Sequence, residues 1–453
     1  MPEVTVRQHH ALVRIAHWLM LPLLVGLIMS GLSVYWAAPV YPPGFPKSFY
    51  DLFSFGRQAL AVGLLLHWFF AYLFMVCGLL YLVGLIAGGG WLALTPRRGD
   101  FREALAMIRY YLGLIPMRLR RRPWPHPQID AKYNALQRAA YASIPFFGLV
   151  VVASGWAMHK PVQFWWLERL FGSYDGARII HFWTMWFFVA FAVPHVILVI
   201  ADGWATMRSM ITGWSTRTSH DRRDFVLFGV GVVAAFAGFR MIRKGRLPRT
   251  VLAFDDYVAE ALYSPTRSVR TYSRKDVTPL KNNYEGKTPG PEYLANWTLT
   301  LSGLASGHDV QLTVADLLRF AHHEQVTRLV CVEGWSAIAW WGGLRFDELL
   351  RAYPPMEGAR WAALESAVNL DWRGGSDPYY VSIDLPTARH AQTLLATHNN
   401  GAPLTLAHGA PLRLVVPMKL GLKNIKAITR IAYTREEPRD YWGERGYSRY
   451  DGL

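Results

Sequence analysis

Four histidines lie inside long apolar segments of this 453-residue chain, where a polar side chain is costly. His181 and His195 bound one stretch of such a segment, HFWTMWFFVAFAVPH. In a helix, their spacing returns to within roughly 40° of the starting direction, so both imidazoles would share one face at depths about 21 Å apart. His17 and His67 lie in two earlier apolar segments. The pattern predicts a helix bundle that carries imidazoles at two depths.

Four apolar segments are long enough to cross about 30 Å of hydrocarbon as helices. They cover residues 11–36, 59–87, 139–159 and 179–201. Between the second and third segments, residues 95–138 hold ten Lys and Arg against three Asp and Glu. This charge predicts a cytoplasmic connection and an N-terminus on the same side of the membrane. Because topology accounts for the location of the basic residues, the formal net charge of +16 does not predict nucleic-acid binding.

With this orientation, the four histidines match in depth as two pairs. His17 and His195 would lie at the inner depth, and His67 and His181 at the outer depth. Two stacked pairs of neutral imidazoles suit two b-type haems, in which each six-coordinate iron takes two axial nitrogens and carries electrons. The alternative for any one of these histidines is a polar group packed in the bundle. His159 is excluded from the pairs because no other histidine matches its depth.

Three segments carry a resemblance to a known family. They are RIAHW at residues 14–18, LLHWFF at 65–70 and the two-histidine segment of the fourth span. Together they resemble the di-haem cytochrome b subunits of nickel-iron hydrogenases and formate dehydrogenases, over about residues 7–210. The resemblance implies two haem b groups, quinone or quinol as co-substrate near the inner haem, and a multi-pass location in the lipid of a bacterial inner membrane.

Residues 216–250 separate this bundle, residues 1–215, from a C-terminal part, residues 251–453. The separating segment holds the pair Arg222 and Arg223, followed by a moderately apolar stretch at 225–239. This arrangement resembles a twin-arginine export signal set inside the chain. It predicts a fifth transmembrane helix and a periplasmic C-terminal domain. The basic residues that follow favour the alternative, a surface-lying helix and a cytoplasmic domain.

The C-terminal part has the composition of an α+β domain, with short apolar segments between polar and glycine-rich ones. The segments WTLTLSG, VQLTVADLLRF and VTRLVCVEGWS predict a strand, a helix and a strand. Cys331 lies at the end of the last strand, before a Gly-Trp-Ser turn. A lone cysteine is by default a buried core residue. A disulfide with Cys77 is not expected, because that residue lies within the second span.

Two further segments, RLVCVEGWSAIAWWGG and NNGAPLTLAHGAPLRLVVPMKLGLKNIKAI, are similar to the sulfite oxidase superfamily of molybdenum enzymes, over about residues 260–445. The resemblance implies that Cys331 supplies a thiolate to molybdenum held by molybdopterin, and soft sulfur suits that metal. Arg413 would bind a phosphate bidentately. By position, the implied cofactor contacts are Asn282, Tyr284, Glu285, Ser366, His408, Arg413, Asn424, Ile425 and Lys426, with Lys423 close by and Asp371 as the alternative to Ser366.

The predicted fold is therefore an all-α transmembrane bundle of four haem-bearing helices and a fifth span, fused to an α+β sulfite-oxidase-like molybdopterin domain. No arginine follows Cys331 in the next five residues, whereas sulfite oxidases typically place an oxyanion-binding arginine there. Trp335, Trp340 and Trp341 predict an aromatic rim suited to a neutral substrate. These features are nearer to the methionine sulfoxide reductase branch.

The resemblance implies that electrons pass from quinol through the inner and outer haems to molybdenum, which reduces an S-oxide or N-oxide. One alternative reverses the flow, with oxidation of sulfite or a related sulfur compound and delivery of electrons to quinone. Another is a non-catalytic electron-transfer module that docks a separate redox partner. The sequence is compatible with a homo-oligomer.

Overall fold

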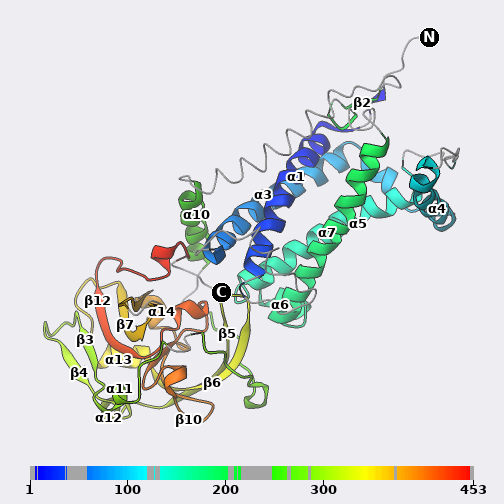
Figure 1. Ribbon diagram of the computed structural model, residues 1–453. Coiled ribbons are helices and arrows are strands. Elements are labelled where there is room, and N and C mark those ends of the chain that lie inside the picture. The colour runs from blue at the N-terminus through cyan, green and yellow to red at the C-terminus, as the bar shows by residue number, and fades with distance from the viewer. Residues whose placement is uncertain are drawn as a thin grey trace. The chain divides into compact units, whose positions relative to one another are not determined.

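A computed structural model of the protein has two compact units (Figure 1). One unit comprises residues 1–29, 66–156 and 176–245, and the other comprises residues 30–65, 157–175 and 246–453. The structure describes residues 6–7, 9–35, 37, 59–119, 127, 133–202, 209–211, 213–215, 247–262, 267–283, 287–371 and 375–448.

Four helices of the described chain are long and apolar enough to cross a membrane, which confirms the predicted spans. They are α1 (Ala11–Tyr35), α3 (Ala59–Ala87), α5 (Ala135–His159) and α7 (Tyr174–Asp202). Large apolar side chains such as Val76, Leu79 and Ile86 are more than half exposed, as expected of helices that face lipid.

Helix α5 begins four residues before its predicted start at residue 139 because of a local cap. The Asn134 side chain accepts a hydrogen bond from the Gln137 backbone N–H at 2.8 Å, and the Gln137 side chain accepts one from the Asn134 backbone N–H at 3.1 Å. This reciprocal capping satisfies two backbone donors that an uncapped helix start would leave open. Apolar periodicity alone does not reveal such an extension.

Shorter elements accompany the spans. A 3₁₀ turn, η2 (Gly90–Leu94), and a 20-residue helix, α4 (Asp100–Leu119), lie between α3 and α5. A one-turn helix, α6 (Trp165–Leu170), precedes α7, and strand β1 (Val6–Arg7) pairs with β2 (Trp214–Ser215). The predicted fifth span at 225–239, with its twin-arginine-like start, lies outside the described residues. The next described element is α10 (Leu247–Leu262).

The C-terminal part is built on two five-stranded sheets (Figure 1), which confirms the predicted α+β fold. One sheet has the order β10-β9-β6-β5, with β11 also paired to β9, and the other has the order β4-β3-β12-β7-β8. Their strands are β3 (Leu299–Ser302), β4 (Val310–Leu312), β5 (His323–Val330), β6 (Ser336–Arg345), β7 (Trp361–Asn369), β8 (Pro378–Asp384), β9 (Leu394–Asn399), β10 (Ala402–Pro403), β11 (Arg413–Val415) and β12 (Ile428–Thr434).

Short helices precede, connect and follow these strands. They are η3 (Arg274–Asp276), α11 (Glu292–Ala295), α12 (Val314–Leu317), α13 (Phe346–Ala352), α14 (Leu385–Ala388), η4 (Leu406–His408), η5 (Gly421–Lys423) and η6 (Gly443–Arg445). The segment VQLTVADLLRF, predicted as one helix, is divided between β4 and α12. The reason is a capping box at Thr313 and Asp316, which ends the extended backbone and starts the helix.

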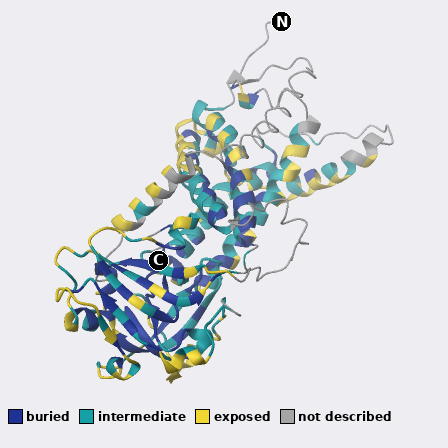
Figure 2. Cartoon of the chain, turned by 60° about the vertical axis from the view of Figure 1, so that its left-hand side comes forward, coloured by how far each residue is buried: buried dark blue, intermediate teal, exposed yellow. Residues whose placement is uncertain are grey.

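One large hydrophobic cluster contains residues from both five-stranded sheets, for example Leu301, Leu364 and Leu395. Buried residues alternate with less buried ones along β7, as expected of a strand with one face toward the core. Figure 2 shows this dark, buried interior within the sheets. The connections near Cys331, His408 and Lys423 are therefore attached to a rigid framework.

Candidate functional site

The four histidines of the spans meet in the predicted pairs. The ring centres of His17 and His195 are 6.2 Å apart, and those of His67 and His181 are 6.1 Å apart. Two metal–imidazole bonds of about 2 Å, with about 1 Å from each ring centre to its nitrogen, would separate two ring centres by about 6 Å. The spacing of both pairs fits one axially ligated iron between the rings.

The ring of His181 is held by helix α5. Its Nδ1 atom lies 2.9 Å from the Val151 carbonyl oxygen and 3.2 Å from the Ser154 hydroxyl. A hydrogen bond from Nδ1–H to a carbonyl leaves Nε2 as the metal-binding nitrogen, as is usual for ligating histidines. A Cβ atom at Gly155 would lie 3.3 Å from the His181 ring, so glycine leaves the ring its space.

Cys331 lies in the loop that joins β5 to β6. These strands form a hairpin in which Val330 pairs with Ser336, and the five residues between them make the turn. Gly334 closes the turn with a φ of 84°, a conformation that favours glycine, and its N–H donates to the Cys331 carbonyl at 2.9 Å. The Cys331 thiol is buried. Burial, and then the negative charge of Glu333, raises its pKa to about 12.

Two consecutive asparagines connect the thiol to a cationic region. The Asn283 amide donates to the Cys331 sulfur at 3.6 Å, and the Asn282 side-chain oxygen accepts from the Lys426 ammonium at 2.9 Å. The Asn283 side-chain oxygen is buried without a hydrogen-bond partner among the described residues. In addition, a Cβ atom at Gly421 would lie 3.5 Å from Cys331 Cα, so the turn η5 closely approaches the cysteine.

The cationic region consists of Lys426, Arg413 and His408. Lys426 Nζ donates to the Ala407 carbonyl at 2.8 Å, and Arg413 donates to the His408 carbonyl at 3.0 Å. Gly409 has a φ of 98°, and a Cβ atom there would lie 2.7 Å from the Lys426 Cβ. Burial, and then the positive charges of Lys426 and Arg413, lowers the pKa of His408.

Basic side chains that lie close together in a buried region favour the binding of an anion there. Burial, and then the charge of Arg413, lowers the pKa of Lys426 to about 7. A phosphate would reverse this effect, because opposite charge stabilises the ammonium. The buried thiol of Cys331 at one end and these cations at the other therefore fit a molybdopterin, with its sulfur-bound metal toward Cys331 and its phosphate toward Lys426.

This fit predicts a pH dependence for cofactor binding. Above pH 7 the free protein carries Lys426 increasingly as the neutral amine, whereas the phosphate-bound form favours the ammonium, so binding takes up a proton. We expect the affinity of cofactor-free protein for molybdopterin to fall by up to about tenfold per pH unit above pH 7, until the pKa of the bound form is reached.

The measurement is a titration of cofactor-free protein with molybdopterin at several pH values. The matched variant is Lys426→Arg, whose guanidinium stays charged throughout the range, so its affinity should be nearly independent of pH. An equally flat profile for the unsubstituted protein would contradict the prediction.

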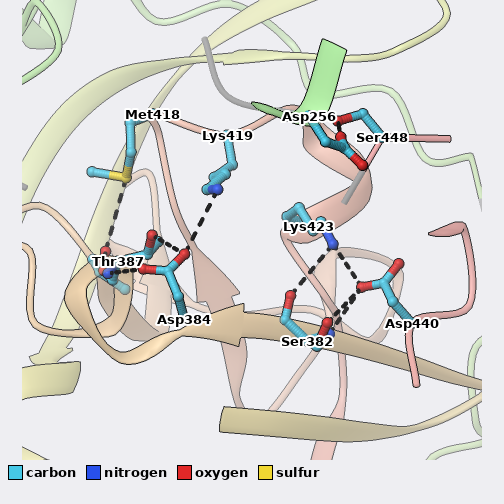
Figure 3. A network of polar contacts seen from close by, with 10 residues as sticks. Asp256, Ser382, Asp384, Thr387, Met418, Lys419, Lys423, Asp440 and Ser448 are labelled. Atoms are coloured by element: carbon cyan, nitrogen blue, oxygen red, sulfur yellow. Dashed lines mark hydrogen bonds and ion pairs between the residues drawn. The ribbon is translucent and has the colours of Figure 1, made fainter. Parts of the chain in front are cut away.

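Lys423, which the sequence places beside the phosphate-binding turn, is directed elsewhere. Its ammonium donates to Asp440 at 2.6 Å and to the Ser382 carbonyl at 3.4 Å, as Figure 3 shows. Burial would raise the pKa of Asp440, but the charge and hydrogen bond of Lys423 and the N–H of Ser382 hold it below its ordinary value. Lys423 therefore forms a buried structural ion pair.

Other predicted cofactor contacts bind backbone groups of the protein instead of lying among the cations. The Ser366 hydroxyl donates to the Lys426 carbonyl at 2.6 Å, and the Asn424 side-chain oxygen accepts from the Val416 N–H at 2.8 Å. The Ile425 side chain is fully buried in the hydrophobic core, and its backbone carbonyl accepts from the Leu414 N–H at 2.9 Å. Asp371 interacts with Gly375 in a separate loop. Tyr284 and Glu285 lie outside the described residues.

The predicted aromatic rim is wrong for one residue. Trp341 is fully buried in a hydrophobic cluster, and the Arg413 guanidinium lies over its ring at 4.5 Å from the ring centre. Trp335 remains near Cys331, where its indole N–H donates to the Glu333 carboxylate at 3.0 Å. Trp341 thus supports the cationic region instead of lining a substrate entrance.

Sequence reasoning missed two residues beside the thiol. Glu333 Oε2 accepts from the Asn283 amide and from the Lys281 ammonium, each at 3.3 Å. Asn283 is adjacent to the predicted Asn282, but its proximity to Cys331 depends on a contact between residues 48 positions apart. Glu333 follows Cys331 by two positions in the turn, and that short spacing was the available signal.

Comparisons with known proteins match the two parts separately. A family model described as prokaryotic cytochrome b561 matches residues 8–213. A family model described as oxidoreductase molybdopterin binding domain matches residues 285–442. These ranges include the four paired histidines in one case, and Cys331 with Lys426 in the other.

Individual relatives agree with this division. The chain is 35% identical over 202 residues to the putative protein-methionine-sulfoxide reductase subunit YedZ1 of Azospira oryzae, covering 44% of the chain and 73% of the relative. It is 33% identical over 245 residues to the protein-methionine-sulfoxide reductase catalytic subunit MsrP of Xanthomonas campestris, covering 51% and 74%. For MsrP of Xanthomonas axonopodis the identity is 34% over 191 residues, covering 39% of the chain and only 59% of the relative.

Proposed function

Because the chain belongs to the prokaryotic cytochrome b561 family in its N-terminal half and to the molybdopterin-binding oxidoreductases in its C-terminal half, we propose that it is a quinol-dependent reductase of S-oxides or N-oxides. The proposal includes two haem b groups, one for each histidine pair, and a periplasmic C-terminal domain. It is a multi-pass membrane protein, with four spanning helices in its described part.

The observation that carries the direction of the reaction is the pair of side chains beside Cys331. The neutral Asn283 amide donates both to the Cys331 sulfur and to the Glu333 carboxylate, so an acidic group lies close to the thiol. A carboxylate there disfavours a negatively charged substrate such as sulfite by like-charge repulsion, whereas a neutral S-oxide or N-oxide is unaffected. The exposed Lys281 pairs with Glu333 and so does not replace an oxyanion-binding arginine.

When bound, the haems would supply one-electron transfer through the membrane, and the molybdenum would supply oxygen-atom transfer. Reduction of one S-oxide consumes two electrons and two protons and yields a thioether and water. The chain's own part is to hold imidazoles at two depths, to present the Cys331 sulfur at a rigid hairpin turn, and to fix an anionic cofactor tail with Lys426 and Arg413.

The test starts from anaerobically purified protein reduced with a soluble quinol analogue, with haem absorbance as the readout. Adding methionine sulfoxide or trimethylamine N-oxide should reoxidise the haems, and the thioether or amine should form at one molecule per two haem electrons. Adding sulfite to oxidised protein should leave the haems oxidised.

Two results would overturn the proposal. Haem reduction by sulfite in the absence of quinol would establish the reverse direction of electron flow. Haems that stay reduced with every oxide and stay oxidised with sulfite, in protein shown to contain molybdenum, would indicate an electron-transfer module that serves a separate partner. Protein without its pterin is the control, and its haems should respond to none of these compounds.

A further inference from the structure

Helix α4 carries an apolar stripe that the described protein leaves uncovered. Phe101, Leu105, Ile108 and Leu112 are 83%, 41%, 40% and 74% exposed. They follow one another at steps of four, three and four residues, so they share one face of the helix. Met107, on another face, is fully buried. The helix is therefore packed on one side and open along the other.

The rotation of α4 about its axis is fixed by an arginine at the start of α5. Arg138 is 2% exposed, and it pairs with Asp100 and, at 3.1 Å, with Glu103. Glu103 also accepts a hydrogen bond from the Ala135 N–H at 2.8 Å. At about 100° per residue, Asp100 lies roughly 110° and Glu103 roughly 170° from the centre of the stripe. The two carboxylates are thus held by Arg138 on the side away from the apolar face.

The charges along one side of the stripe are basic. Arg102 and Arg109 are exposed and lie roughly 70° to 90° from its centre on that side, Asp100 on the other side is paired with Arg138, and Arg97 and Arg98 are exposed just before the helix. An apolar centre with a basic border is complementary to a lipid surface, where acyl chains lie beneath anionic head groups.

The position of α4 in the chain also supports lipid as the partner that covers its apolar stripe. It lies in the connection between the spanning helices α3 and α5. The preceding turn η2 exposes Trp91 and Leu92 at 48% and 56%, and tryptophan is enriched where membrane meets water. The stripe spans twelve residues, or about 16 Å of helix. With a helix width of about 10 Å its area is roughly 160 Å², well below the roughly 800 Å² per partner of a stable protein interface.

We propose that α4 is an interfacial helix that lies in the head-group region of an anionic bilayer, with Phe101, Leu105, Ile108 and Leu112 directed into the acyl chains. The ion pairs of Arg138 set the angle at which the stripe meets the lipid. This inference is independent of the reaction that the protein catalyses.

The test uses the full chain in vesicles of phosphatidylethanolamine and phosphatidylglycerol. A nitroxide is attached to Leu112→Cys, and its collision rates with oxygen, which concentrates in lipid, and with a water-soluble nickel chelate are measured. The label should collide several-fold more with oxygen than with nickel. The matched control is Ala106→Cys, an exposed position roughly 130° from the stripe, whose label should prefer nickel. The native Cys77 and Cys331 are buried, and unsubstituted protein gives their background.

Each other outcome contradicts the proposal. A nickel preference at Leu112→Cys would mean that the stripe faces water, and shielding from both reagents would mean that protein covers it. In vesicles of phosphatidylcholine alone, the oxygen preference should fall, because the basic border loses its counter-charge. An unchanged preference for oxygen would show that anionic lipid does not contribute to the binding of α4. Helix content by circular dichroism identifies any variant that has not folded.

Discussion

Replacing Cys331 with serine should lower substrate-linked turnover by more than about a hundredfold, beyond the loss typical of removing an outer-shell partner of a metal ligand. Serine offers a hard, weakly acidic oxygen in place of a soft thiolate, so the metal would lose its only proposed protein ligand. Lys426 and Arg413 are untouched by the change, and their side chains would still hold the cofactor's phosphate. Haem absorbance and pterin content should therefore remain at their original levels.

The chain provides a matched control in its second cysteine. Cys77 is buried in α3, where its thiol donates to the Ala16 carbonyl at 3.3 Å. A serine hydroxyl can make the same donation, so Cys77→Ser should keep both haem content and turnover. Full turnover in Cys331→Ser would refute the ligand assignment. Loss of pterin together with turnover would show instead that the cysteine is required for cofactor retention.

The spans and the histidine pairs were predictable because two strong regularities determine them. Hydrocarbon thickness sets the length of a span, and the helical period sets which residues share a face. These rules correctly predicted that His181 lies beside His67 and that His195 lies beside His17. The early start of α5 was not predictable from apolar periodicity, because a side-chain cap at Asn134 extends the helix beyond its apolar residues.

Helix α4 escaped prediction for a related reason. Its apolar residues are separated by charged ones and are too few for a span, so the segment reads as a basic connection. Recognising it requires the pattern of exposure and the ion pairs of Arg138, both of which depend on contacts with another helix. Long-range contacts also explain why Asn283 and Glu333 were missed around Cys331.

The error at Trp341 was avoidable on local grounds. Trp340 and Trp341 are consecutive in β6, and successive side chains of a strand point to opposite faces. Both rings therefore could not line the same rim. By contrast, Lys423 and Lys426 have similar sequence settings, and only the position of Asp440 in the folded chain separates the structural lysine from the one in the cationic region.

Substitution of the paired histidines should remove haem one site at a time. His67→Ala or His181→Ala should lower the haem content from two to one per chain, and His17→Ala or His195→Ala should remove the other haem. Because both members of a pair hold one iron, the double variant of His67 and His181 should lose no more haem than either single variant. Pyridine haemochrome absorbance per mole of protein measures these contents.

His159→Ala is the matched control for these variants, because it also removes an imidazole from the end of a spanning helix. Its haem content should stay at two. A milder variant, His181→Met, should keep the outer haem and raise its reduction potential, since methionine is a weaker axial donor than imidazole. That shift would also distinguish ligation from packing, because a packing role predicts no change in potential. Full haem content in all four alanine variants would contradict the pairing of imidazoles around iron.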